Sequence, residues 1–216
     1  MATVNSDLTT RPAEANGSDL GRTLQIKSAA FDLLAEEGLE GLTIRAVLKR
    51  TGLARRAFYE RFAGKDDLVL AVFEDTLRRL ADILAEKAKA DANPSETIRN
   101  FVFDVVMGEL RHGERGIDRR GAAFSREHLR LAESRPAELQ AALHPVLTLL
   151  AEQVAAGIRS GEFRDSDPQL QAALLYNVVS TTAHVEMLAD EGRPDDGRRQ
   201  RLAEEVWEFC RRAITV

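Results

Sequence analysis

The chain has few of the residues that define several classes of protein. Cys210 is its one cysteine among 216 residues, so no disulfide can form within the chain and an oxidising compartment is not required. Aromatic residues make up 6%, and no alternation of apolar and polar residues lasts beyond a few positions, so strands have little support. The longest apolar run, residues 68–73, is six residues, far short of the roughly 18 that a membrane span needs. We expect no membrane partner.

The first 18 residues also lack a long apolar stretch. They are rich in Thr, Ser, Asn, Pro and Gly and include Asp7 and Glu14. This composition is typical of a disordered arm, and it matches neither a secretory signal nor an Arg-rich transit peptide. We therefore predict a disordered arm over residues 1–18 and a cytoplasmic protein.

From residue 19 onward the apolar residues recur at helical spacing. Ser95 is expected to be an N-cap, and Pro145 is expected at the first position of a helix. The predicted helices cover about residues 19–37, 44–51, 55–62, 66–92, 95–111, 121–134, 145–159, 168–189 and 196–213. The fold class predicted is all-α, with one domain over residues 19–66 and a larger helical domain over residues 67–216.

Positive charge is concentrated in one short segment. The whole chain has a net charge of −5, yet residues 43–65 contain seven basic residues and one acidic residue, Glu60. The basic residues are Arg45, Lys49, Arg50, Arg55, Arg56, Arg61 and Lys65. Such a run is either a solvated helix face or the electrostatic footprint of a nucleic-acid partner.

The pattern inside this segment favours the nucleic-acid partner. A short helix, a tight turn near Thr51-Gly52-Leu53 and a second short helix predict a helix-turn-helix at about residues 43–62. Arg55 and Arg56 would point outward, where an arginine can pair with guanine O6 and N7. The apolar residues Leu53, Phe58 and Phe62 would face the core.

Three further stretches make the pattern more specific: GLTIRAVL at 41–48, GLA at 52–54 and FYERFAGKDDL at 58–68. Together they resemble the DNA-binding domain of the tetracycline-repressor (TetR) family, and the resemblance covers about residues 20–80. It implies a homodimer with a three-helix DNA-binding domain and a larger helical ligand-binding domain. It also implies a double-stranded DNA operator as partner.

Carried over by position, the resemblance implies phosphate contacts by Thr43, Tyr59 and Lys65. It places Arg45, Arg55, Arg56 and Ala57 toward the groove. Glu60 stands where the family commonly has an aromatic or basic residue, so its carboxylate would either repel phosphate or accept a hydrogen bond from cytosine N4. Ala54 stands where the family commonly has a serine-type N-cap.

The last two predicted helices are apolar on more than the one face that packing against a single neighbour would bury. Leu170, Leu174, Val178, Thr181 and Val185 form one stripe, and other faces are apolar too. The spare face would pack either inside its own domain or on a second copy, and we expect the second copy. The predicted interface residues are Leu175, Val179, Thr182, Met187, Leu202, Val206 and Phe209.

The resemblance further implies a mostly apolar ligand pocket among the middle helices. The candidate lining residues are Phe103, Met107, Phe124, His128, Leu147, Tyr176 and Asn177, each of which has the alternative of being an ordinary core residue. His184 is a further pocket candidate, but hydrogen-bonded structural histidines are more common, and this is the favoured alternative for both His128 and His184. The expected function is a repressor whose operator affinity is lowered by a small, mostly apolar effector; an activator of the same fold is the alternative.

Enzymes were considered as a competing class. The four histidines show no HExxH spacing, one cysteine cannot form a zinc knuckle, and no phosphate-loop or Gly-x-Ser-x-Gly pattern occurs. We therefore predict no catalytic residues, no metal and no cofactor. A small-molecule-binding protein or an enzyme without DNA binding remains an alternative, whereas a pure interaction scaffold leaves the basic segment unexplained.

Overall fold

A computed structural model describes residues 13–91, 93–108, 117–190 and 195–216. Within these residues the chain forms nine helices, and one isolated antiparallel bridge joins Phe163 and Thr215. The helices are α1 (Ala13–Gly41), α2 (Ile44–Thr51), α3 (Arg55–Tyr59), α4 (Lys65–Ala88), α5 (Pro94–Met107), α6 (Ile117–Ser134), α7 (Pro136–Ser160), α8 (Pro168–Asp190) and α9 (Asp196–Ile214). The predicted all-α fold class is confirmed.

The helix-turn-helix forms where the sequence predicts it, because local signals fix both of its ends. The side chain of Thr43 accepts a hydrogen bond from the Ala46 N–H at 3.0 Å and so caps α2. Gly52 ends α2 with a φ of 69°, a left-handed conformation that glycine adopts at little cost. The chain then turns directly into α3.

Several predicted boundaries differ from the structure, including the end of α1, which continues across a kink at Gly38 to Gly41, and the start of α6 at Ile117. Helix α1 begins at Ala13, so the predicted arm is helical over residues 13–18, where Ala13 and Ala15 favour a helix; residues 1–12 lie outside the described part. The cap of α5 is Asn93, not Ser95, with Pro94 at the start of the helix. Helix α7 begins at Pro136, which leaves Pro145 in its interior.

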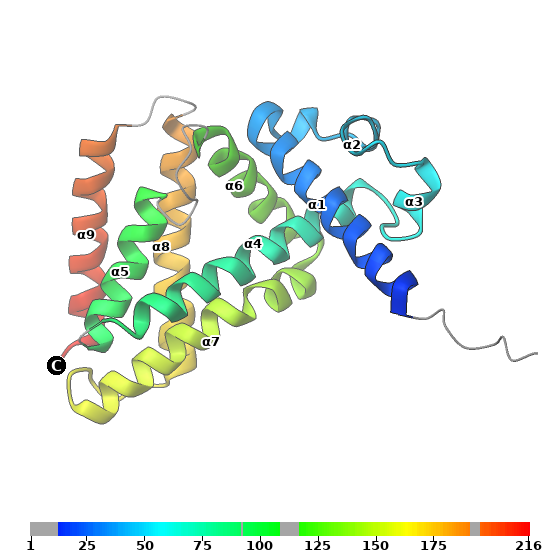
Figure 1. Ribbon diagram of the computed structural model, residues 1–216. Coiled ribbons are helices and arrows are strands. Elements are labelled where there is room, and N and C mark those ends of the chain that lie inside the picture. Colours follow the sequence, from blue (N-terminus) through cyan, green and yellow to red (C-terminus); the bar gives the residue numbers. More distant parts are fainter. Residues whose placement is uncertain (1–12, 92, 109–116, 191–194) are drawn as a thin grey trace, which may run out of the picture.

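The helix-turn-helix and the last helix lie at opposite ends of the molecule (Figure 1). Helix α1 packs on α2, α4 and α6, and α4 packs on α7 and α5. Helices α7, α5 and α6 pack in turn on α8, and α5 also packs on α9. Helices α4 and α6 therefore both link the three N-terminal helices to the rest of the bundle.

One described helix, α7, is long and apolar enough to cross a membrane by length and composition. It packs on α4, α5, α6 and α8, and it buries Leu143, Val146, Leu150 and Val154. Core helices of water-soluble proteins have the same character, so its composition is explained by its place in the bundle.

The packing of α7 requires a glycine. A Cβ atom built on Gly157 would lie 2.1 Å from Cδ2 of the Phe163 ring, which is itself buried. We expect Gly157→Ala to lower the free energy of unfolding by about 1–3 kcal/mol through overpacking, measured by urea denaturation. Gly21→Ala is the control, because Gly21 in α1 has open space around it and gains helix propensity. Equal effects of the two variants would contradict this account.

Candidate nucleic-acid interface and ligand cavity

The two faces of α3 differ sharply in exposure. Phe58 is fully buried, and its ring lies 5.6 Å from that of the buried Phe62. The side chain of Arg56 is 89% exposed, and Tyr59 is 45% exposed. Helix α3 therefore presents a polar, cationic face to solvent, as the sequence predicts, with Arg55, Arg56, Tyr59 and Glu60 exposed and Ala57 half-buried.

Arg55 and Tyr59 form a unit on this face. The Arg55 Nη2 group donates a hydrogen bond to the Tyr59 hydroxyl at 3.3 Å, and the guanidinium carbon lies 5.4 Å from the centre of the tyrosine ring. A ring that holds the guanidinium reduces the rotamer freedom that would be lost on binding. Both groups retain donors that can reach an acceptor outside the chain.

Several of the other basic side chains already have partners in the chain. Arg56 Nε donates to Glu60 Oε1 at 2.8 Å in an exposed pair. Arg50 pairs with Glu36, whose carboxylate raises the arginine pKa. Arg61 is only 6% exposed in its side chain; it pairs with Asp19 and donates to the Ala57 carbonyl. The formal charge of the segment therefore exceeds the charge available to a partner.

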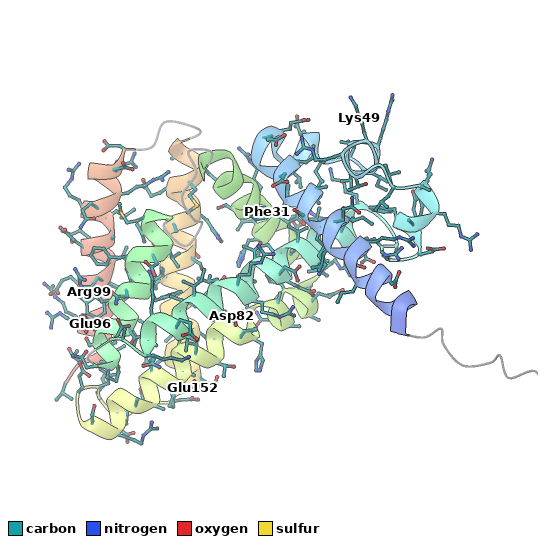
Figure 2. All side chains as sticks on the ribbon, viewed as in Figure 1. Phe31, Lys49, Asp82, Glu96, Arg99 and Glu152 are labelled. Carbon is teal, nitrogen blue, oxygen red and sulfur yellow. The ribbon has the colours of Figure 1, made fainter. Side chains whose placement is uncertain are left out.

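Helix α2 carries the remaining cations of the interface. Arg45 and Lys49 are exposed, and neither has an ion pair within the described part of the chain. The Lys49 side chain extends from α2 away from the rest of the molecule (Figure 2). Lys49 was not among the predicted contacts; its place in the basic segment is the signal that could have identified it. The exposed Thr43 lies at the start of the same helix.

Lys65 lies at the start of α4, where the sequence predicts an anion site. Its Nζ donates to the Leu39 carbonyl at 2.9 Å and so joins α4 to the end of α1. An ammonium has three donors, so this bond leaves two for a phosphate. Lys65 therefore has a structural role, and its contact with phosphate stays a prediction.

Two carboxylates in the first turn of α4 tie it to the corner between α6 and α7. Asp66 lies 3.4 Å from Arg130 of α6, and Asp67 lies 3.3 Å from Arg135, the residue before α7. Arg130 also pairs with the buried Glu127. The start of α4 is thus held by the helical domain on one side and by α1 on the other.

A cavity of about 460 Å³ lies within the helical domain and reaches α1 through Phe31. This volume falls within the range of small-molecule pockets, about 300–1,000 Å³. Its lining is mainly apolar, from α4, α5 and α8, and His128 comes from α6. Figure 2 labels two of the lining residues, Phe31 and Asp82. The apolar lining residues are Phe31, Phe73, Leu77, Leu80, Ile83, Val105, Ala183 and Met187.

Some of the predicted pocket residues line the cavity and others do not. His128 and Tyr176 line the cavity, and so does His184. Four other predicted residues are not part of this lining: Asn177 is exposed, the Phe103 ring lies 4.3 Å from the guanidinium carbon of Arg99, and Met107 and Leu147 are half-buried. The side chain of Phe124 lies outside the described part. Arg79, Asp104 and Ser180 line the cavity without having been predicted.

Aromatic groups gather around His128. Its ring centre lies 4.6 Å from that of His184, 5.9 Å from that of Phe73 and 6.3 Å from that of Tyr176. Burial lowers the pKa of His128, which favours the neutral imidazole. Burial also raises the pKa of Tyr176, which hydrogen-bonds with Ser180. Burial therefore favours the uncharged forms of His128 and Tyr176.

The apolar faces of α8 and α9 are arranged differently from the prediction. Four of the predicted interface residues are buried within the chain itself: Leu175, Val179, Met187 and Val206. The prediction is wrong for these four, because they pack in the core or line the cavity. Thr182 and Leu202 are half-buried and Phe209 is exposed. The exposed large apolar residues of the two helices are Leu170, Leu174, Val185 and Phe209.

The chain is similar to known bacterial regulators, most specifically in its N-terminal part. The family model described as "Bacterial regulatory proteins, tetR family" matches residues 26–72. The fatty acid metabolism regulator protein of Bacillus subtilis is 22% identical over 172 residues, which cover 78% of this chain and 84% of that protein. The transcriptional repressor AcnR of Corynebacterium glutamicum is 34% identical over 91 residues, and the match covers 42% of each chain.

Solved structures share the fold along nearly the whole chain. A TetR-family transcriptional regulator from Pectobacterium atrosepticum has a TM-score of 0.74 at 19% identity and covers 96% of this chain and 98% of its own. The regulator FadR from Bacillus subtilis, in complex with stearoyl-CoA, has a TM-score of 0.66 at 21% identity. That match covers 87% of this chain and 96% of FadR.

The burial of Arg61 predicts a structural role for one of the basic residues. We expect Arg61→Ala to lower the free energy of unfolding by about 1–3 kcal/mol, because it removes charged hydrogen bonds at a buried position. Arg56→Ala is the matched control, since it breaks only an exposed pair worth about 0.5 kcal/mol or less. Denaturant unfolding of both variants measures the difference, and a larger loss for Arg56→Ala would refute it.

Proposed function

Because the chain belongs to the TetR family of bacterial regulatory proteins, we propose that it is a dimeric transcriptional repressor. It binds a pseudo-palindromic DNA operator, and a small, mostly apolar effector lowers its affinity for that operator. Relatives named as repressors support repression over activation. The curated relatives are named as regulators rather than enzymes, and we propose a non-enzymatic role in the cytoplasm, where the operator lies.

The single observation that carries the proposal is the orientation of α3. Its buried Phe58 directs Arg55, Arg56 and Tyr59 outward from the same short helix. An outward helix of this kind fits the major groove, where arginine reads guanine through two hydrogen bonds. Thr43 and Lys65 flank the helix-turn-helix and supply contacts to phosphate. Glu60 can accept from cytosine N4 once Arg56 has turned to the DNA.

Two copies are needed to read a pseudo-palindrome. Recognition helices of a two-fold dimer enter successive major grooves when they are about 34–36 Å apart. Helices α8 and α9 carry the exposed apolar residues Leu170, Leu174, Val185 and Phe209, and these helices lie at the end of the molecule away from α3 (Figure 1). Pairing these helices across a two-fold axis would bury them and leave both copies of α3 free.

The cavity is the proposed effector site. Its mostly apolar lining suits an apolar molecule, and the structurally similar FadR was solved with stearoyl-CoA. Helix α6 offers a route from the cavity to the DNA: His128 lines the cavity, and Arg130 pairs with Asp66 at the start of α4. An effector that shifts α6 would move this anchor, and by linkage DNA and effector weaken each other's binding equally.

The proposed roles predict different effects of two cationic residues. Arg55→Ala should remove about 1–3 kcal/mol of discrimination at one base pair of each half-site. Lys65→Ala should weaken binding to all duplexes alike and reduce the salt dependence by about one phosphate contact. Fluorescence anisotropy with a selected operator and its single-base variants, over a range of salt concentrations, measures both.

The control for these variants is Arg159→Ala, an exposed arginine near the end of α7, which should leave DNA binding unchanged. Because Lys65 also bonds to Leu39, the fold of Lys65→Ala is checked by circular dichroism. A change of base preference on Lys65→Ala, or no change on Arg55→Ala, would refute the assigned roles.

The proposed dimer predicts a specific disruption. Leu174→Glu would place unpaired carboxylates in the apolar interface, so the dissociation constant of the dimer should rise by about 100-fold or more. Leu20→Glu is the control, because Leu20 is equally exposed but lies in α1 at the opposite end. Sedimentation equilibrium measures the oligomeric state. A dimer that is unaffected by Leu174→Glu would exclude this face.

A further inference from the structure

Four of the polar residues that line the cavity come from α6 and α8, whereas Thr76, Arg79 and Asp82 come from α4 and Asp104 comes from α5. His128 comes from α6, and Tyr176, Ser180 and His184 come from α8. The contact of 4.6 Å between the two imidazole ring centres joins the two helices across the cavity. The lining from α4 near them is apolar, including Phe73 and Leu77. The cavity therefore combines a long apolar wall with one cluster of hydrogen-bonding groups.

One of the two acidic side chains of the lining, that of Asp104, is paired with a cation. Both carboxylate oxygens of Asp104 on α5 accept from Lys87 Nζ, at 2.7 and 2.6 Å. Asp82 on α4 is exposed, three residues from the exposed Arg79, which also lines the cavity. Helices α1 and α7 also pack on α6 but contribute no titratable side chain to the described lining. The charges of the lining thus balance, and they do not favour a cation.

His128 lacks a partner for its ring nitrogens. Within the described part of the chain, its contacts are the three ring contacts alone, and no side chain or backbone group hydrogen-bonds to it. A half-buried imidazole that borders a cavity in this state has one N–H to donate and one nitrogen that can take a proton. A molecule in the cavity is the natural partner for both.

We infer that the cavity binds an amphiphile with a weak-acid head group, whose carboxyl group meets the imidazoles of His128 and His184 while its apolar part lies along α4. This inference rests on the proposed function, since it names the chemical class of the effector. Two adjacent imidazoles match the two oxygens of a carboxylate, whereas an alcohol offers one oxygen. Burial keeps His128 neutral in the empty cavity, so binding of the anion takes up one proton from solvent.

The sign of the pH dependence follows from this proton. The carboxylate raises the pKa of the imidazole in the complex above its lowered value in the free protein. The affinity for the acid is therefore highest below the pKa of His128 in the free protein. It falls by up to about tenfold per pH unit as the pH rises from that value to the higher pKa of the complex. An uncharged alcohol of the same chain length shows no such dependence.

The test compares decanoate, decanol and decyltrimethylammonium by isothermal titration calorimetry with the full-length protein. Titrations in two buffers of different ionisation enthalpy, between about pH 6 and 8, measure the protons taken up. We expect decanoate to bind about tenfold or more tightly than the other two, with uptake of close to one proton per site. Equal affinity for decanol, tighter binding of the cation, no binding of decanoate, or no proton uptake would each overturn the inference.

A matched pair of variants assigns the effect to the site. His128→Gln keeps a hydrogen-bonding group but cannot take up the proton, so the proton uptake should be lost and decanoate affinity should fall about tenfold, with decanol affinity unchanged. His144→Gln on the exposed face of α7 should behave as the parent protein. Identical behaviour of the two variants would overturn the inference.

Operator binding in the presence of decanoate separates this inference from the proposed function. Tight, proton-coupled binding of decanoate that leaves operator affinity unchanged would support the ligand class and refute the effector role. Operator release by decanol as readily as by decanoate would support an effector-responsive regulator and refute the acid-specific site.

Discussion

The direction in which the side chains proposed to read DNA point depends on the burial of one aromatic ring. Helix α3 has five residues and no side-chain cap at its start, and a helix that short is not stable alone. Its position is set by Phe58, which is fully buried in the same core as Leu42 and Val47. Arg55 and Tyr59 then point outward because they occupy the opposite face. The reading surface is thus a consequence of a core contact.

Helix α4 carries this constraint into the rest of the molecule. Its first turn holds Lys65, which bonds to the end of α1, and Asp66 and Asp67, which bond to arginines of the α6–α7 corner. Farther along the same helix, Phe73 and Leu77 line the cavity. The cavity and the proposed phosphate contact of Lys65 therefore share one helix. A molecule in the cavity that displaced α4 would therefore also displace Lys65.

The helix-turn-helix could be predicted from the sequence because Thr43 and Gly52 act on their own neighbours. The faces of α8 could not be predicted in the same way. This helix is apolar on several sides, so periodicity alone does not distinguish the stripe with Leu175 and Val179, which is buried, from the stripe with Leu170 and Leu174, which is exposed. The cavity poses the same difficulty, because it forms between α1, α4, α5, α6 and α8 and depends on how they pack. The sequence suggests His128 and His184 as pocket candidates, but the contact between them depends on the fold.

The number of basic residues in the sequence also overestimates the positive charge that the structure exposes. Seven basic residues in one segment indicate a DNA-binding surface, yet Arg61 is buried and Arg50 is paired with Glu36. The positive surface is therefore narrower than the segment, and it is concentrated on α2 and the start of α3, where Arg45, Lys49 and Arg55 are exposed. The remainder of the chain is acidic overall and repels the phosphate backbone. The basic surface, by contrast, attracts the phosphate backbone. Approach to DNA through the basic surface is therefore favoured before any base contact forms.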